Sequence, residues 1–134
     1  MTTPLWQGIF PAVTTKFHPD ERIDAEGTAR HIDFQIRNGI HGVVTCGSLG
    51  EASTLSLDEK LEVARIAMEA SGGRVPVLAN VSETSTRDAL RYIDGANNLG
   101  VDGYMVMPSV IYVADAREAM ANVRAMAKAA QKPL

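Results

Sequence analysis

The sequence predicts an α/β fold, namely the first half (four βα units) of a (β/α)8 TIM barrel. Short apolar runs alternate with amphipathic stretches four times along the 134 residues. The apolar runs begin about 34, 33 and 28 residues apart, the length of a right-handed crossover between parallel strands. No G-x-G-x-x-G turn follows the first run, which disfavours the doubly wound dinucleotide-binding sheet, the other architecture with such a series.

The four predicted strands are nearly continuous apolar segments, as expected for parallel strands that are buried on both faces. They cover residues 8–15, 42–46, 75–81 and 103–107. Each is followed by a stretch with helical periodicity, so strand and helix alternate regularly along the chain.

Each predicted helix has a recognisable first residue. The first is expected to begin near Asp24 and to end at 38–39, and the third is expected to end at Gly100. The other three begin at a hydroxyl or carboxylate residue that is followed three positions later by an acidic residue, the pattern of a capping box. These pairs are Ser56 with Glu59, Ser85 with Asp88, and Asp115 with Glu118.

One domain is predicted over residues 1–134, the N-terminal half of a TIM-barrel domain ending at the start of strand five. A complete barrel of this type has about 250 residues. Four parallel strands alone would leave unpaired edges and an uncovered inner face. We therefore expect the front part of a longer protein, or a chain whose barrel is completed by another polypeptide.

Composition excludes several classes of function. The chain has 46% hydrophobic and 22% charged residues and a net charge of -3, which describes a globular protein without the clustered cations that bind nucleic acid. Its apolar runs are too short to span a bilayer, and residues 1–6 lack the pattern of a signal peptide. With a single cysteine, the chain is expected in the cytoplasm, bound neither to membranes nor to nucleic acid.

The segment Gly47-Ser48-Leu49-Gly50-Glu51 follows the second predicted strand. Small residues let backbone N–H groups approach an anion closely, and a hydroxyl adds a further donor. Two other interpretations remain open, a plain strand-to-helix turn and a phosphate-binding loop. The second is disfavoured because the loop lacks the lysine of G-x-x-x-x-G-K-[ST] and lies several residues before Ser56.

This loop resembles the G-[ST]-x-G-E loop of the dihydrodipicolinate synthase / N-acetylneuraminate lyase family. The segments GIFPAVTTKF, GGRVPVLANVSETST and LGVDGYMVMP resemble the first, third and fourth strands of that family, so the resemblance covers essentially the whole chain. It implies a (β/α)8 barrel, usually a homo-tetramer, without a cofactor. It also implies a lyase in which a lysine on strand six forms a Schiff base with a 2-oxo acid such as pyruvate.

The resemblance also implies roles for individual residues. Ser48 and Leu49 would hold the substrate carboxylate, Gly47 and Gly50 would shape the turn, and Glu51 would brace it. Dihydrodipicolinate synthases typically carry a second threonine at the position of Leu49, as part of a proton relay with a tyrosine.

The fourth loop also departs from that pattern. It reads Pro108-Ser109-Val110-Ile111-Tyr112, which leaves Tyr112 as a displaced candidate for the catalytic tyrosine. MPSVIYVADAREAM is similar to the branch that deaminates 1-pyrroline-4-hydroxy-2-carboxylate, and related sugar-acid aldolases and dehydratases stay open.

The chain offers four candidates for the Schiff-base amine, Lys16, Lys60, Lys128 and Lys132. The last three are expected to face solvent. Lys16 follows the first strand on the correct face, but the resemblance places the reactive lysine on strand six, beyond Leu134. We therefore expect the full-length protein to be a lyase and this chain alone to be inactive. The alternative is a half-barrel binding or scaffold protein completed by self-association or by a second chain.

The remaining reactive side chains favour no other chemistry. Cys46 is expected to be a small buried side chain, because no histidine is placed to activate it as a nucleophile. His18, His31 and His41 have no metal-ligand spacing, so no metal site is predicted.

Overall fold

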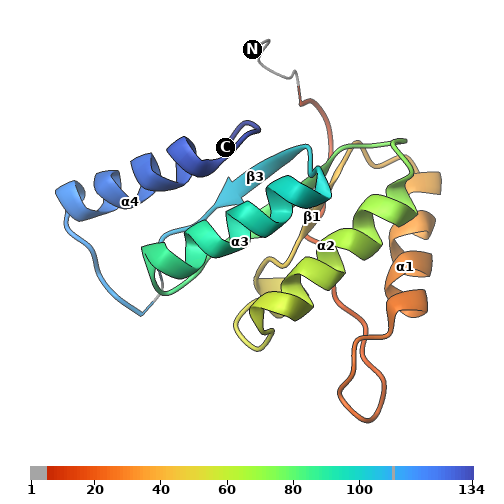
Figure 1. The fold of residues 1–134 in the computed structure, drawn as a ribbon. Helices are drawn as coiled ribbons and strands as arrows, with labels where there is room; N and C mark the ends of the chain where they lie inside the picture. The colour runs from red at the N-terminus through yellow and green to blue at the C-terminus, as the bar shows by residue number, and fades with distance from the viewer. Residues whose placement is uncertain (1–5, 110) are drawn as a thin grey trace.

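The computed structural model of the chain describes residues 6–109 and 111–134. It contains a parallel sheet of three strands in the order β1 (Val43–Thr45), β2 (Val77–Val81) and β3 (Gly103–Val106). Residues 1–5, for which no signal peptide was predicted, and Val110 of the fourth loop lie outside the described residues. Figure 1 shows that strands and helices alternate along the chain, as the sequence predicts.

The helices begin where the capping residues predict. They are α1 (Ala25–Arg37), α2 (Leu57–Ser71), α3 (Thr86–Leu99) and α4 (Ala116–Ala129), together with the short 3₁₀ turn η1 (Ser48–Gly50). The N-caps of the four α-helices are Asp24, Ser56, Ser85 and Asp115, and each side chain accepts a hydrogen bond from a backbone N–H of the first turn. The capping boxes of α2 and α4 are complete.

The first predicted strand, residues 8–15, forms only one isolated bridge, between Ala12 and Val44. The segment still runs parallel to β1, because Val44 N–H donates to the Pro11 carbonyl at 2.9 Å and Val13 N–H donates to the Val44 carbonyl at 3.0 Å. Pro11 has no N–H to donate, which limits the ladder that this segment can form. The prediction of a regular strand is therefore wrong, although the segment occupies the place of one beside β1.

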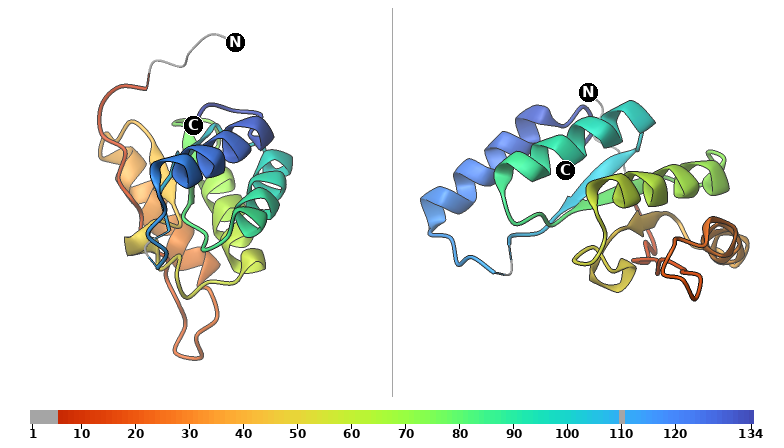
Figure 2. Two further views of the ribbon diagram at one scale, coloured as in Figure 1. Left: turned by 90° about the vertical axis from the view of Figure 1, so that its left-hand side faces the viewer. Right: turned by 60° about the horizontal axis from the view of Figure 1, so that its bottom comes forward.

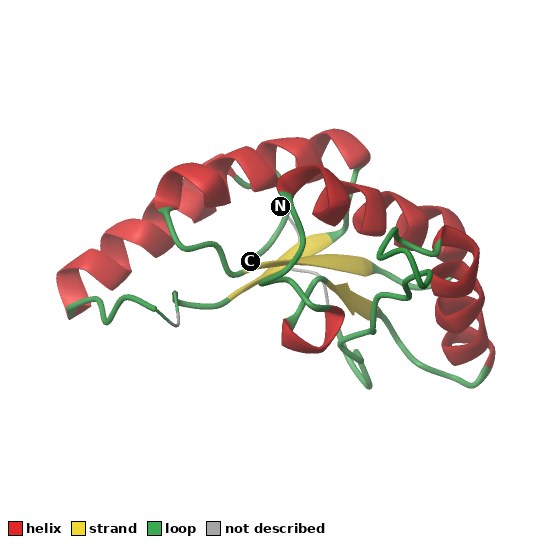
Figure 3. Cartoon of the chain, turned by 90° about the horizontal axis from the view of Figure 1, so that it is seen from below, coloured by secondary structure: helices red, strands yellow, loops and turns green. Residues whose placement is uncertain are grey.

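The four α-helices lie on one side of the sheet, in an arc that Figure 3 shows from below. Ala79 and Val81 of β2 pack against α3, where Tyr92 and Ile93 are fully buried. Val43 and Val77 pack instead with Ile32 of α1 and Ala67 of α2. Because side chains alternate along a strand, Val44, Leu78 and Asn80 point toward the opposite face of the sheet.

Neighbouring helices pack in chain order, and the two views in Figure 2 show α1 beside α2 and α3 beside α4. After α4 the chain returns to the edge of the sheet, where the Tyr104 N–H donates to the Pro133 carbonyl at 2.9 Å. The strands are parallel and follow one another across the sheet in chain order, which agrees with part of a barrel. In the described segments we find no helix with the length and apolar character needed to cross a bilayer.

Candidate functional site

The turn predicted to bind an anion lies at the carboxyl end of β1, the edge at which α/β proteins place their ligands. Cys46 leaves the strand with φ +54°, η1 covers Ser48–Gly50, and Glu51 closes the turn with φ +62°. A left-handed conformation is uncommon for residues other than glycine. Gly47 and Gly50 are buried, whereas Ser48 and Leu49 are exposed, Leu49 with 67% of its surface accessible.

Backbone hydrogen bonds inside the turn leave two donors free. Gly50 N–H donates to the Gly47 carbonyl at 2.9 Å, and Glu51 N–H donates to the Ser48 carbonyl at 3.2 Å. The N–H groups of Ser48 and Leu49 begin the helical turn and so have no partner within it. Neither makes a hydrogen bond in the part of the chain that the structure describes. The turn therefore presents two adjacent amides and the Ser48 hydroxyl.

The two glycines of the turn differ in what surrounds them. A Cβ atom on Gly50 would lie 3.0 Å from the Val13 carbonyl oxygen, which is too close for a relaxed contact. A Cβ atom on Gly47 would lie 3.5 Å from the Ala12 Cβ atom, an ordinary van der Waals distance. Close packing against the segment beside β1 thus favours a glycine at position 50 but not at position 47.

Two side chains that the sequence did not single out contact the turn. The Thr15 hydroxyl donates to the Gly50 carbonyl at 2.8 Å, and the Asn80 side-chain N–H donates to the Cys46 carbonyl at 2.8 Å. Both residues are buried. Their partners lie 35 and 34 residues away along the chain, so no local pattern could reveal these contacts.

The prediction that Lys60 faces solvent is wrong. Only 7% of its side chain is exposed, and its ammonium lies 2.7 Å from Oε1 of Glu83. This ion pair lies on the helical side of the sheet, where Lys60 is buried in α2. The sequence signal was indirect: Lys60 falls on the buried side of the helix together with Val63, Ala64 and Ala67.

The other three lysines lie in different parts of the chain. Burial of the ring lowers the pKa of His31 in α1, and the positive charge of Lys16 lowers it further. Lys128 and Lys132 are exposed in and after α4. The prediction of solvent-facing lysines therefore holds for these two.

Cys46 is fully buried, as predicted. Burial raises the pKa of its thiol from 9.0 to about 11, so the group is protonated at neutral pH. A protonated, inaccessible thiol is a poor nucleophile. The side chain packs with Ala52, Leu55 and Val63 below the turn.

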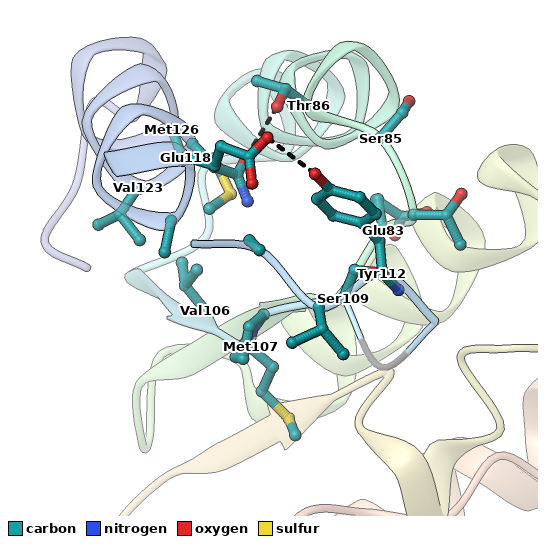
Figure 4. Close-up of a pocket in the computed structure, with 16 residues that line it drawn as sticks. Glu83, Ser85, Thr86, Val106, Met107, Ser109, Tyr112, Glu118, Val123 and Met126 are labelled. Atoms are coloured by element: carbon teal, nitrogen blue, oxygen red, sulfur yellow. Dashed lines mark hydrogen bonds between the residues drawn. The ribbon is translucent and has the colours of Figure 1, made fainter. Parts of the chain in front are cut away.

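Tyr112 lies in a different place from the turn. It lines a pocket of about 600 Å³ between the end of β3, the start of α3 and α4 (Figure 4). Its hydroxyl donates to Oε1 of Glu118 at 2.7 Å, and this hydrogen bond raises the pKa of the phenol. Neither Ser48 nor Leu49 lines this pocket. The structure therefore does not bring Tyr112 and the turn into one site within the described chain.

His18 lies 3.9 Å from Asp24, an acid that caps α1, and His31 contacts Gln35 on the same helix. Within residues 6–109 and 111–134, no group of three His, Cys, Asp or Glu side chains is arranged to hold a metal ion.

These features define a class of protein: a parallel α/β chain whose architecture agrees with part of a (β/α)8 barrel, with a glycine turn at the carboxyl edge of its sheet. The chain belongs to the dihydrodipicolinate synthetase family, whose family model matches residues 5–134.

Curated relatives include enzymes with different names. The chain is 36% identical over 130 residues to the 4-hydroxy-tetrahydrodipicolinate synthase of Methanosarcina mazei, covering 97% of this chain and 44% of that relative. It is 38% identical over 128 residues to the N-acetylneuraminate lyase of Rhizobium meliloti, covering 96% and 43%. The chain thus spans less than half of the length of these relatives.

Solved structures agree in fold. A prophage protein of the dihydrodipicolinic acid synthase family from E. coli K12, in complex with pyruvate, matches with a TM-score of 0.89 and 34% identity, covering 97% of this chain and 44% of that one. The 4-hydroxy-tetrahydrodipicolinate synthase of Methylacidiphilum fumariolicum SolV matches with a TM-score of 0.90 and 29% identity, covering 95% and 42%. Named members of this family include 4-hydroxy-tetrahydrodipicolinate synthases and an N-acetylneuraminate lyase, and its solved members have a TIM-barrel fold.

Proposed function

We propose that this chain supplies the substrate-carboxylate loop of a lyase that acts on a 2-oxo acid through a Schiff base. The observation that carries the proposal is the pair of free N–H groups at Ser48 and Leu49, beside an exposed hydroxyl at the carboxyl edge of β1. Adjacent amides and a hydroxyl bind a carboxylate without a formal positive charge. The pyruvate complex of the E. coli K12 relative supports a 2-oxo acid as the ligand class.

We also propose that the reactive amine comes from outside residues 1–134. Formation of a Schiff base requires a neutral amine that attacks the keto carbon, with loss of water. Lys60 is held by Glu83, the charge of Lys16 acts on His31, and Lys128 and Lys132 are exposed on and after α4. The role of this chain in the reaction is then to bind and orient the substrate, while another segment provides the covalent partner.

The choice of branch within the family rests on residue 49, which follows Ser48 in the turn. Leu49 carries no proton that could pass to a substrate, and its side chain is 67% exposed. We therefore favour a branch other than the dipicolinate synthases, such as the deaminase of 1-pyrroline-4-hydroxy-2-carboxylate or a sugar-acid dehydratase. All these substrates carry the carboxylate that the turn would bind.

A second candidate function is a half-barrel binding or scaffold protein that associates with itself or with another chain. It is favoured by apolar side chains that are exposed around α4. These are Ile111, Val113, Met120 and Val123. Sedimentation would show a monomer if these residues remain in water, and a homo-oligomer or a mixed assembly if they are covered.

Titration of the ¹⁵N-labelled chain tests the carboxylate loop directly. We expect pyruvate to shift the amide signals of Ser48 and Leu49 in a saturable way. Acetone, which has the keto group but no carboxylate, should leave them unchanged. Inorganic phosphate is the second comparison, because a phosphate loop would respond to it more strongly than to pyruvate. Shifts confined to residues around Tyr112, or none at all, would contradict the proposal.

Reduction with borohydride tests the proposal that the reactive amine comes from outside residues 1–134. After incubation with pyruvate and borohydride, we expect the mass of the chain to stay at the unmodified 14.4 kDa. A covalent adduct mapped to Lys16 or Lys60 would show that the chain carries its own Schiff-base lysine.

A further inference from the structure

We infer that Thr15 and Asn80 are positioning residues for the Gly47–Gly50 turn, holding its two ends so that its free amides face the substrate. This inference rests on the proposed function, since it concerns the same carboxylate loop. It adds two residues from two different segments, one beside β1 and one on β2, to the residues that the loop motif itself contains.

The carboxyl end of the turn is held by Thr15. Its hydroxyl donates to the Gly50 carbonyl at 2.8 Å, and only 5% of Thr15 is exposed. The approach is close on this side, since a Cβ atom at position 50 would lie 3.0 Å from the Val13 carbonyl and 3.7 Å from the Thr15 hydroxyl. Gly50 is thereby held by a hydrogen bond, in a place with little room for a larger side chain.

The amino end of the turn is held by Asn80. Its side-chain N–H group donates to the Cys46 carbonyl at 2.8 Å, and Asn80 is 1% exposed in the middle of the sheet. Cys46 has φ +54°, a conformation that residues with a side chain adopt only when their surroundings impose it. A donor on the Cys46 carbonyl supplies such a constraint at the residue where the chain leaves β1.

Both bonds bear on the direction of the free amides. A carbonyl and the next N–H belong to one rigid peptide plane, so fixing the Cys46 carbonyl also fixes the Gly47 N–H. Only the few φ and ψ angles between this plane and the next fixed point remain free to rotate. Fixing the Gly50 carbonyl closes the segment from its other end. Ser48 and Leu49, which lie between the two fixed points, then present their N–H groups without reorganising when an anion binds.

The Asn80 amide makes a second hydrogen bond outside the turn. The same side-chain nitrogen lies 3.1 Å from the Ser82 hydroxyl, which follows β2. Ser82 therefore provides a matched control, because its replacement removes a bond to Asn80 and leaves the bond to Cys46 in place. Thr15 offers its own control, since serine keeps the hydroxyl and valine keeps the shape without it.

The experiment compares four variants of the chain in the pyruvate titration: Thr15→Val, Thr15→Ser, Asn80→Ala and Ser82→Ala. Loss of one hydrogen bond to the turn is expected to weaken pyruvate binding about tenfold in Thr15→Val and Asn80→Ala. Thr15→Ser and Ser82→Ala should stay within about twofold of the parent chain. Urea unfolding of each variant establishes that the comparison is made between folded proteins.

A second readout needs no ligand. The N–H groups of Gly50 and Ala52 both donate to the Gly47 carbonyl, at 2.9 and 3.3 Å. We expect their hydrogen exchange to accelerate in Thr15→Val and Asn80→Ala but not in Thr15→Ser. Folded Thr15→Val protein with parental exchange and parental pyruvate affinity would overturn the inference, even if Asn80→Ala does not fold. The parent chain could fail to bind pyruvate while hydrogen exchange at Gly50 and Ala52 still accelerates in Thr15→Val. That result would refute the proposed carboxylate loop and leave the positioning contacts established.

Discussion

The ammonium of Lys60 lies 2.7 Å from Oε1 of Glu83 and 2.9 Å from its Oε2, in an ion pair that joins α2 to the loop after β2. The two side chains are 7% and 16% exposed. The pair fixes the start of α3 relative to α2, directly beside the buried Cys46, whose thiol lies 3.7 Å from the Lys60 carbonyl. A lysine that sequence reasoning assigned to solvent is thus part of the interior.

Replacement of Lys60 by methionine should destabilise the chain strongly. It would leave the Glu83 carboxylate buried without its partner, at a cost of about 3–5 kcal/mol in the free energy of unfolding. The double variant Lys60→Met/Glu83→Leu should recover most of that loss, because neither charge then remains. Arg65→Ala is the control on the same helix, since the exposed Arg65–Glu69 pair contributes less than about 0.5 kcal/mol. Urea unfolding measures all three, and equal losses in Lys60→Met and Arg65→Ala would contradict a buried pair.

The glycines of the turn should respond differently to alanine. Gly50→Ala forces a Cβ atom to within 3.0 Å of the Val13 carbonyl, so the turn must shift. We expect about 1–3 kcal/mol of destabilisation. Gly47→Ala meets only the Ala12 Cβ atom at 3.5 Å and should cost less than about 1 kcal/mol. Thermal unfolding of the two variants decides the matter, and a reversed order would show that the turn has another conformation.

The alkaline stability of the chain should depend on Cys46. Burial raises the pKa of the thiol from 9.0 to about 11 in the folded chain. Above pH 9 the unfolded state loses the proton first, so the stabilisation is complete below pH 9 and declines as the pH rises to about 11. Cys46→Ala should remove up to about 2–3 kcal/mol of that decline. The remaining fall belongs to buried tyrosines such as Tyr92, whose pKa burial also raises.

The free energy of unfolding is measured from pH 7 to 11 for the parent chain and for Cys46→Ala, and the difference between the two curves gives the contribution of the thiol. A parallel pair of curves would show that the thiol ionises as easily in the folded chain as in the unfolded one.

Tyr112→Phe should leave pyruvate binding by the turn unchanged within about twofold, because the Tyr112 hydroxyl is bound to Glu118 of α4 and lines another pocket. The same variant removes the hydrogen bond that helps to lower the pKa of Glu118, after the larger effect of the Asp115 N–H. A Glu118 titration followed by NMR should therefore move toward higher pH. Loss of pyruvate affinity in Tyr112→Phe would place this residue in the carboxylate site after all.

Sequence reasoning succeeded where the determinants are local. Ser56 and Glu59 satisfy the first N–H groups of α2 from within four residues, so their spacing alone predicts the start of that helix. The crossover lengths and the glycine turn after β1 are likewise local or periodic features. The family itself was predicted from the resemblance of the loop and of three strand segments to those of its members, and the family match over residues 5–134 confirms it.

The sequence could not reveal features that depend on contacts across the sheet. Asn80 reads as one residue of a predicted strand, and its bond to the Cys46 carbonyl arises only when β2 lies beside β1. Lys60 was misjudged for the same reason, because its partner Glu83 is 23 residues away. The strand predicted for 8–15 is a different case, because Pro11 stands in the sequence and its missing N–H argues against a regular strand, whereas the prediction used the apolar character alone.

The Gly47–Gly50 turn is the proposed carboxylate site, and a crystal structure of the chain grown with pyruvate tests that assignment most directly. We predict the pyruvate carboxylate within about 2.7–3.2 Å of the backbone nitrogens of Ser48 and Leu49, with Thr15 and Asn80 still bonded to the ends of the turn. Pyruvate bound only in the pocket beside Tyr112, with an unoccupied turn in the same crystal, would contradict it.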